Sequence, residues 1–192
     1  MKNILISFFI LLNLPFAGAQ EVEGASPGQF SLRTNLAILA VLAPSLGLEY
    51  QFNNKLAVML DGSFAYWNFE TETRNKYWRL IHISPKVRQY VNPLRNAYLA
   101  LQFDIGAYNI AQEIGKFKGG GIAFGKQYYL TKNTWIDLGL TFGYLHFSDR
   151  KKYDEINDTY YLEEDKGRKN YWGPTQVSIN IIRKLNVLTR SH

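Results

Sequence analysis

The sequence predicts an all-β protein, an eight-stranded antiparallel up-and-down transmembrane β-barrel with a filled polar lumen. Three observations favour this fold class. Apolar and polar residues alternate with a period of two through most of the chain, and the chain begins with a segment typical of exported proteins. Aromatic residues gather toward both ends of the predicted strands, as they do at the two interfaces of a membrane.

The first residues are typical of a cleaved signal peptide. Met1–Asn3 form a short positive region, residues 4–16 are almost all apolar, and Ala17-Gly18-Ala19 puts small residues where a signal peptidase reads. We therefore expect a signal peptide at 1–19, a short extension at 20–28, an outer-membrane β-barrel at 29–185 and a tail at 186–192. The chain has no Cys, which excludes disulfides, thiol chemistry and a lipoprotein anchor. The predicted location is the outer membrane of a Gram-negative bacterium.

The predicted strands are eight runs of alternating residues, near 29–38, 45–53, 56–69, 76–92, 97–112, 119–131, 134–149 and 168–185. Short connections at 53–55, 93–96 and 131–133 alternate with longer ones at 39–44, 70–75, 113–118 and 150–167. This alternation is typical of a meander whose short turns face the periplasm and whose long loops face outward.

The two faces of these strands differ in composition. In residues 56–69, one face is large and apolar and the other is small or polar: Leu56, Val58, Leu60, Phe64 and Tyr66 against Ala57, Asp61, Ser63 and Ala65. Eight strands enclose a space only just wide enough for side chains, so the small face belongs inside and the apolar face points into lipid. The alternative is a soluble lipocalin-like ligand-binding barrel with the apolar face inside, whose outer surface would carry little charge.

The aromatic residues at the strand ends predict two interfacial girdles. Toward the long loops lie Tyr66, Trp67, Phe69, Tyr77, Trp78, Tyr108, Tyr144, Tyr171 and Trp172; toward the short turns lie Tyr50, Phe52, Tyr90, Tyr128, Tyr129 and Trp135.

The formal net charge is +6, and the basic residues gather toward the predicted outer rim: Arg74, Lys76, Arg79, Lys116, Lys118, Arg150, Lys151, Lys152, Lys166, Arg168 and Lys169. The expected partners at this rim are outer-membrane lipid and the phosphates of lipid A. We expect no nucleic acid partner, because the chain is predicted to be exported.

Charged residues on the inward positions of the strands form the first candidate site, a lumen polar network of Arg33, Glu49, Asp61, His82, Lys86, Arg88, Asp104 and Asp137. Charges in so narrow a space must pair or be hydrated. They come from strands around the whole barrel and not from beside one nucleophile, so we interpret them as a plug that blocks conduction. His82 has no second His or Cys beside it, and we expect no metal and no cofactor.

A second candidate site is the pair His146 and Ser148, two residues apart and therefore on the same, lipid-facing side of a strand. It resembles the His-x-Ser element of the lipid A deacylases, which implies a lipid A-modifying hydrolase as an alternative function. A carboxylate would then orient the His, and Glu155, Glu163 and Glu164 are all open candidates. We expect no catalytic residue in the leading interpretation.

The longest predicted loop, 150–167, has an acidic centre with apolar and aromatic residues, and its candidate contact residues are Asp154, Glu155, Asp158, Tyr160, Tyr161, Glu163, Glu164 and Asp165. The acids do not follow the calcium-loop pattern. The segment is either a solvated loop or a short hairpin whose tip binds a surface-protein partner.

Four stretches carry a resemblance that covers nearly all of residues 29–182: "RTNLAILAVLAPSLGLEYQFNNKLAV", "HISPKVRQYV", "GGGIAFGKQYYLTKNTWIDLGLTFGYL" and "YWGPTQVSIN". They resemble the small outer-membrane β-barrels of Bacteroidetes known only as a domain of unknown function, within the OmpA-like and lipid A deacylase-like barrels. The resemblance implies no known catalytic activity, and it implies a link with fimbria-type surface systems. A structural or surface-interaction role is therefore the leading functional hypothesis.

Overall fold

The structure is a computed structural model that describes residues 27–71, 74–94, 96–131, 133–156 and 159–185, without the side chains of residues 70, 71, 74, 75, 155 and 156. The predicted signal peptide, most of the extension at 20–28, the tail at 186–192 and Asp158 lie outside the described residues.

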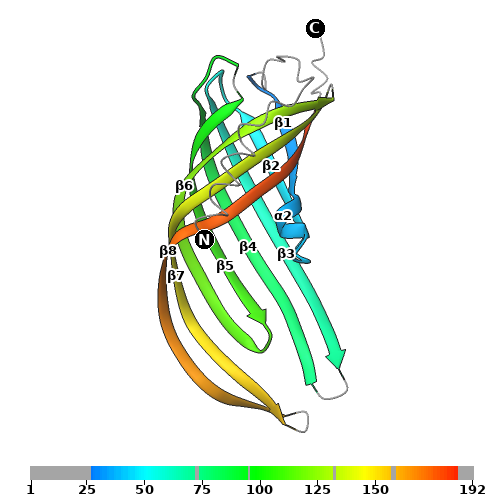
Figure 1. The fold of residues 1–192 in the computed structure, drawn as a ribbon, viewed down its shortest axis with the longest axis vertical. Helices are drawn as coiled ribbons and strands as arrows, with labels where there is room; N and C mark the ends of the chain where they lie inside the picture. Colours follow the sequence, from blue (N-terminus) through cyan, green and yellow to red (C-terminus); the bar gives the residue numbers. More distant parts are fainter. Residues whose placement is uncertain (1–26, 72–73, 95, 132, 157–158, 186–192) are drawn as a thin grey trace, which may run out of the picture.

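The described residues form one closed sheet in which every strand pairs antiparallel with its neighbours in the sequence and β1 pairs with β8 (Figure 1). The strands are β1 (Phe30–Asn35), β2 (Ser45–Gln51), β3 (Leu56–Thr71), β4 (Arg74–Tyr90), β5 (Ala97–Ile110), β6 (Glu113–Thr131), β7 (Thr134–Ile156) and β8 (Thr159–Leu185). The predicted all-β class and eight antiparallel strands are thus confirmed. No helix in the described part of the chain is long and apolar enough to cross a membrane.

The first strand is shorter than predicted. We expected a strand at 29–38, whereas β1 ends at Asn35 and the one-turn helix α2 (Leu36–Leu39) follows it. The Asn35 side chain explains this end. Its amide oxygen accepts hydrogen bonds from the backbone N–H groups of Ala37 and Ile179, and its amide nitrogen donates to the carbonyl of Val177. One side chain therefore caps the helix and also satisfies the edge of β8 beyond the last residue of β1.

Three of the predicted long loops, at 70–75, 113–118 and 150–167, are mostly strand. The predicted loop at 113–118 belongs to β6, and the turn before it consists of Ala111 and Gln112, both with positive φ, as a two-residue hairpin turn requires. Residues 150–156 and 159–167 continue β7 and β8 as a long hairpin, which begins at a bulge near Asp149 (φ 53°). We call the end of the ring that carries these long hairpins the hairpin end, and the opposite end the short-turn end (Figure 1).

The apolar face of the strands points outward. One row of backbone partners runs across six neighbouring strands and is apolar or aromatic throughout: Tyr50, Val58, Val87, Leu101, Ile122 and Phe142. Leu101 is 67% exposed, whereas Ala57 and Ala100 on the opposite face are buried. The soluble alternative required the apolar face to line the interior, and this arrangement is the reverse.

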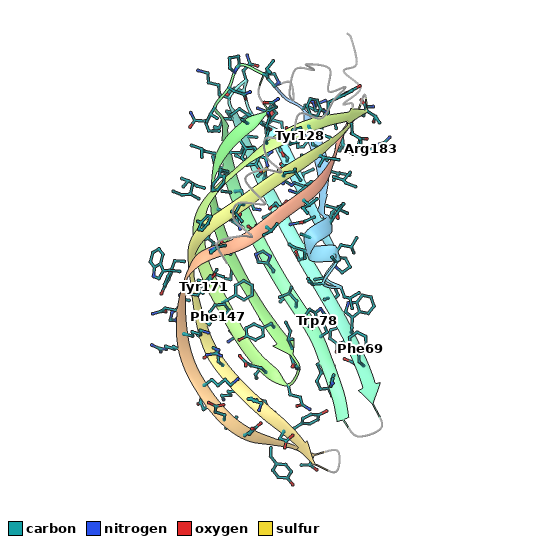
Figure 2. The ribbon with its side chains drawn as sticks, in the orientation of Figure 1. Phe69, Trp78, Tyr128, Phe147, Tyr171 and Arg183 are labelled. Carbon is teal, nitrogen blue, oxygen red and sulfur yellow. The ribbon has the colours of Figure 1, made fainter. Side chains whose placement is uncertain are left out.

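Two aromatic residues assigned to the short-turn girdle point inward instead. Tyr90 and Trp135 are 3% and 2% exposed. Tyr90 lies on the same face of β4 as buried Arg88, and Trp135 on the same face of β7 as buried Asp137. Figure 2 shows Phe69 and Trp78 toward the hairpin end, and Tyr128 and Arg183 toward the short-turn end.

Candidate functional site

Six charged side chains meet inside the ring, and we call them the ionic cluster: Arg33, Glu49, Asp61, Lys86, Arg88 and Asp137. They come from β1, β2, β3, β4 and β7. Because successive side chains of a strand alternate between faces, the inward positions of these strands all aim at the same narrow space.

Asp137 lies at the centre of the ionic cluster. Its Oδ2 accepts a hydrogen bond from Arg88 Nη2 at 2.6 Å and lies 3.4 Å from Arg33 Nη2. Glu49 Oε2 lies 3.2 Å from Arg33 Nη1 and 3.4 Å from Arg88 Nη1. The two arginines and two carboxylates therefore alternate, so that each charge has two partners of opposite sign.

Asp61 extends the ionic cluster toward the hairpin end. Its Oδ2 lies 2.9 Å from Lys86 Nζ, and its Oδ1 lies 3.5 Å from Arg33 Nε. Three cations and three carboxylates are thus in balance. We expected these residues to be spread around the wall, whereas the structure brings them into one cluster. Every carboxylate in it is engaged by cations, so the cluster offers no free acid or base for catalysis.

The remaining two residues of the predicted lumen network, His82 and Asp104, form a separate pair. His82 Nε2 and Asp104 Oδ1 are 2.9 Å apart, and Asp104 also accepts two hydrogen bonds from the Gln102 amide. Lys86 and Gln102 both donate to Gln176 Oε1, which links this pair to the ionic cluster. Among the described residues, no group of three His, Cys, Asp or Glu side chains could hold a metal ion.

Two tyrosines complete the cluster, and the sequence analysis did not find them. Tyr98 donates to Asp137 Oδ1 at 2.7 Å, and the Arg88 guanidinium lies over its ring, 3.7 Å from the centroid. Tyr90 donates to Glu49 Oε1 at 3.0 Å. A Cβ at Gly125 or Gly139 would collide with the Tyr98 hydroxyl, so glycines on β6 and β7 make the space for this ring. The sequence did contain one signal for this contact, because the two tyrosines and the two glycines all fall on the inward positions of their strands.

A smaller charged group lies beyond the apolar row, at the hairpin end. Glu113 accepts hydrogen bonds from Lys166 Nζ at 2.6 Å, from Arg150 Nη2 at 3.1 Å and from the Tyr108 hydroxyl at 3.1 Å. The hydrogen bond from Lys166 is the main cause that lowers the pKa of Glu113 below its usual value. This group fastens the β7–β8 hairpin to the start of β6.

The lowered pKa of Glu113 predicts a pH-dependent contribution to stability. A carboxyl whose pKa is lower in the folded protein stabilises the fold above its ordinary pKa, and the contribution disappears as pH falls through the lowered value. We expect wild type to unfold at a higher urea concentration than Glu113→Gln at pH 6, and the difference should shrink as the pH is lowered toward 3. A difference that persists unchanged at pH 3 would contradict this assignment, and Glu164→Gln is the matched control.

His146, the first residue of the predicted His146 and Ser148 pair, has its hydrogen-bond partner on the neighbouring strand β8. His146 Nδ1 donates to Asn170 Oδ1 at 2.7 Å, and Tyr144 donates to the same oxygen at 2.9 Å. The group that orients His146 is thus an amide of β8 and not a carboxylate. Within the described residues, no hydrogen bond joins His146 to Ser148, and Glu163 binds Lys152 instead.

The tip of the β7–β8 hairpin bends back over the turn between β5 and β6. The Tyr77 and Tyr160 hydroxyls are 2.5 Å apart, and the Tyr153 N–H donates to the carbonyl of Gln112. Tyr161 and Leu162 are exposed beside them. The acidic residues Asp154, Glu164 and Asp165 lie on the same hairpin, Glu155 lies there without a described side chain, and Asp158 lies outside the described residues. The described part of the predicted loop is therefore a strand hairpin, with Tyr161 and Leu162 exposed near its end.

Comparison with known proteins gives one family. The family model described as "Protein of unknown function (DUF3575)" matches residues 5–185. No match was found among the curated proteins or the solved structures.

Proposed function

The chain belongs to the DUF3575 family, and from that premise and the geometry above we propose that it is an integral outer-membrane β-barrel, plugged and non-enzymatic. It serves as a structural or surface-interaction protein. Its short-turn end faces the periplasm, and its hairpin end faces the cell exterior.

The apolar row on the outside of the ring carries this proposal. Tyr50, Val58, Val87, Leu101, Ile122 and Phe142 are neighbours through the backbone register, so together they form a band around six strands. Further exposed apolar residues lie two positions away on the same face, such as Leu60, Leu99 and Phe103. Water-soluble monomers rarely expose so continuous an apolar surface, whereas a lipid-facing barrel requires one.

The ionic cluster supports a barrel that does not conduct. Its three cations and three carboxylates close the interior at one level with side chains bonded to each other, and Tyr90 and Tyr98 occupy the space beside them. An eight-stranded barrel with such contents leaves no water-filled channel. The cluster then acts as a brace between strands that are distant in sequence.

The β7–β8 hairpin is the element proposed to contact a surface partner. Tyr161 and Leu162 are exposed at its tip, and the acidic residues Glu163, Glu164 and Asp165 follow them. The basic residues at the hairpin end, among them Lys118, Lys151 and Lys169, are placed to meet the phosphates of lipid A. We propose a surface-assembly system of the fimbria type as the setting, in line with the resemblance stated above.

Heat-modifiability tests the proposal most directly. We expect protein from an outer-membrane fraction to migrate faster on an SDS gel when it is not boiled, because a closed membrane barrel resists SDS until heated. Deletion of residues 154–165 should leave this shift intact, since the tip lies beyond the apolar row. Recovery of the protein in the soluble periplasmic fraction, without a shift, would refute membrane insertion.

A further inference from the structure

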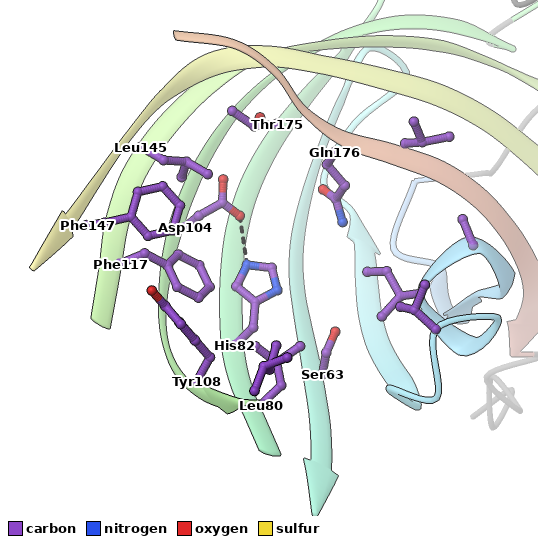
Figure 3. A pocket seen from close by; sticks show the side chains of 15 residues that line it. Ser63, Leu80, His82, Asp104, Tyr108, Phe117, Leu145, Phe147, Thr175 and Gln176 are labelled. Atoms are coloured by element: carbon purple, nitrogen blue, oxygen red, sulfur yellow. Dashed lines mark hydrogen bonds and ion pairs between the residues drawn. The ribbon is translucent and has the colours of Figure 1, made fainter. Parts of the chain in front are cut away.

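A cavity of about 560 Å³ lies inside the ring on the hairpin-end side of the ionic cluster (Figure 3). Most of its wall is apolar and includes Leu80, Phe117, Leu145 and Phe147, and its polar lining residues are Ser63, His82, Asp104, Tyr108, Thr175 and Gln176. The hydrogen-bonded pair His82 and Asp104 lies on one side of it, as Figure 3 shows. The volume lies within the range of roughly 300–1,000 Å³ that is typical of small-molecule sites.

The cavity exists because the inward face of the strands changes character along their length. On β7 the inward residues Thr141 and Gly143 are followed by Leu145 and Phe147. The rings of Phe117 and Phe147 have their centroids 6.0 Å apart, and the ring of His82 lies 5.6 Å from that of Phe117. The polar plug thus gives way to an apolar chamber inside the same ring.

The short β1 opens one side of this chamber. Because β1 ends at Asn35, helix α2 and the segment that follows it supply that part of the wall, through Ala37, Ile38 and Val41. His82, Asp104 and Gln176 in this wall already hydrogen-bond to each other or to lumen neighbours, so few donors or acceptors are left for a peptide or a sugar. The chamber therefore suits a hydrocarbon chain.

Charge at the hairpin end indicates the head group of the occupant. Tyr108 lines the cavity and donates to Glu113, so the Glu113 group lies directly next to the chamber. Two cations, Arg150 and Lys166, bind this one carboxylate, which leaves one net positive charge. A negatively charged head group next to the chamber would balance it.

We propose that this cavity binds a single-chain anionic amphiphile, with the hydrocarbon chain between Leu80, Phe117 and Leu145 and the anionic head at Arg150 and Lys166. The occupant is a free molecule with one chain, because one chain fits a chamber of this size and a two-chain membrane lipid does not. The proposal does not require the barrel to lie in a membrane.

The test measures binding of dodecanoate by isothermal titration calorimetry, with the full protein kept in a non-ionic amphipathic polymer. We expect saturable binding, weakened about tenfold or more by Leu145→Trp, because the indole fills the chamber. The control Leu101→Trp places the same side chain on the outer face and should leave affinity unchanged. If Leu145→Trp does not fold, Leu80→Trp fills the chamber from another strand.

The head-group assignment has its own variants. The double variant Arg150→Gln/Lys166→Gln should weaken binding of dodecanoate but not of uncharged dodecanol, whereas Lys116→Gln, in an exposed pair with Asp149, should change neither. Absence of saturable dodecanoate binding, or unchanged binding in both chamber variants, would overturn the site. Equal binding of dodecyltrimethylammonium would overturn the anionic head, and displacement by two-chain phosphatidylglycerol would overturn the free, single-chain source.

Discussion

Asp137→Asn is expected to lower the free energy of unfolding by about 3–5 kcal/mol, because it removes one partner of a buried ion pair and leaves the charge opposite it uncompensated. Asp137 is fully buried and accepts from both Arg88 and Arg33. A neutral amide in its place leaves two guanidinium groups close together with Glu49 as their only shared counter-charge. The amide nitrogen also cannot accept a hydrogen bond from the arginines, whose guanidinium groups are hydrogen-bond donors only.

Urea unfolding followed by tryptophan fluorescence measures this loss. The matched control is Asp149→Asn, which removes the same charge from an exposed pair with Lys116 at 3.1 Å and should cost less than about 1 kcal/mol. Asn also tolerates the positive φ at position 149. Equal, small losses in the two variants would mean that water reaches the ionic cluster and compensates its charges, and the cluster would then not be a structural brace.

The strand pattern of the ring was predictable from sequence because a period of two is a strong signal wherever the two faces differ. Residues 99–106 alternate without interruption between apolar residues such as Leu101 and small or polar ones such as Gln102. The short turns also fixed the antiparallel order. Both signals are local in the sequence, so they can be recognised without knowing which strands pair.

The ends of the strands could not be predicted in the same way. The extension of β7 from 150 to 156 is mostly charged, with three basic and two acidic residues, because both of its faces lie beyond the apolar row and neither has to be apolar. Its partner, residues 159–167, has Tyr160, Tyr161 and Leu162 in a row and then four charged residues, so neither segment alternates although the strand pairing continues. The end of β1 depends on Asn35, whose three hydrogen bonds reach α2 and β8 and are invisible in a local pattern.

The candidate site divides along the same line. Parity alone indicates that Arg33, Glu49 and Asp137 share the inward side of their strands, but the distances among them depend on the stagger between strands. Tyr98 was missed because the space for its ring beside Asp137 depends on Gly125, its register partner on β6, and on Gly139 on the next strand, β7. The apolar chamber was missed because it depends on a change along the inward face of β7, from Thr141 and Gly143 to Leu145 and Phe147. A contrast between the two faces of a strand does not reveal such a change.

Leu101→Arg is expected to destabilise the barrel in lipid by about 2–4 kcal/mol, because it places a charge on the outer face near the middle of the apolar row. Leu101 pairs with Val87 on one side and Ile122 on the other, so no polar side chain adjoins it along that row. The arginine would be held among hydrocarbon chains, and its long stem would have to bend toward an interface to reach water.

Leu162→Arg is the control, because Leu162 is 53% exposed on the hairpin tip and lies beyond the apolar row. The two leucines have similar exposure in water, so any difference between the variants comes from the medium around them. In lipid vesicles Leu101→Arg should fold poorly or unfold at lower urea, and Leu162→Arg should match wild type. If both variants match wild type, the apolar row does not face lipid, and the proposal of membrane insertion fails on the feature that carries it.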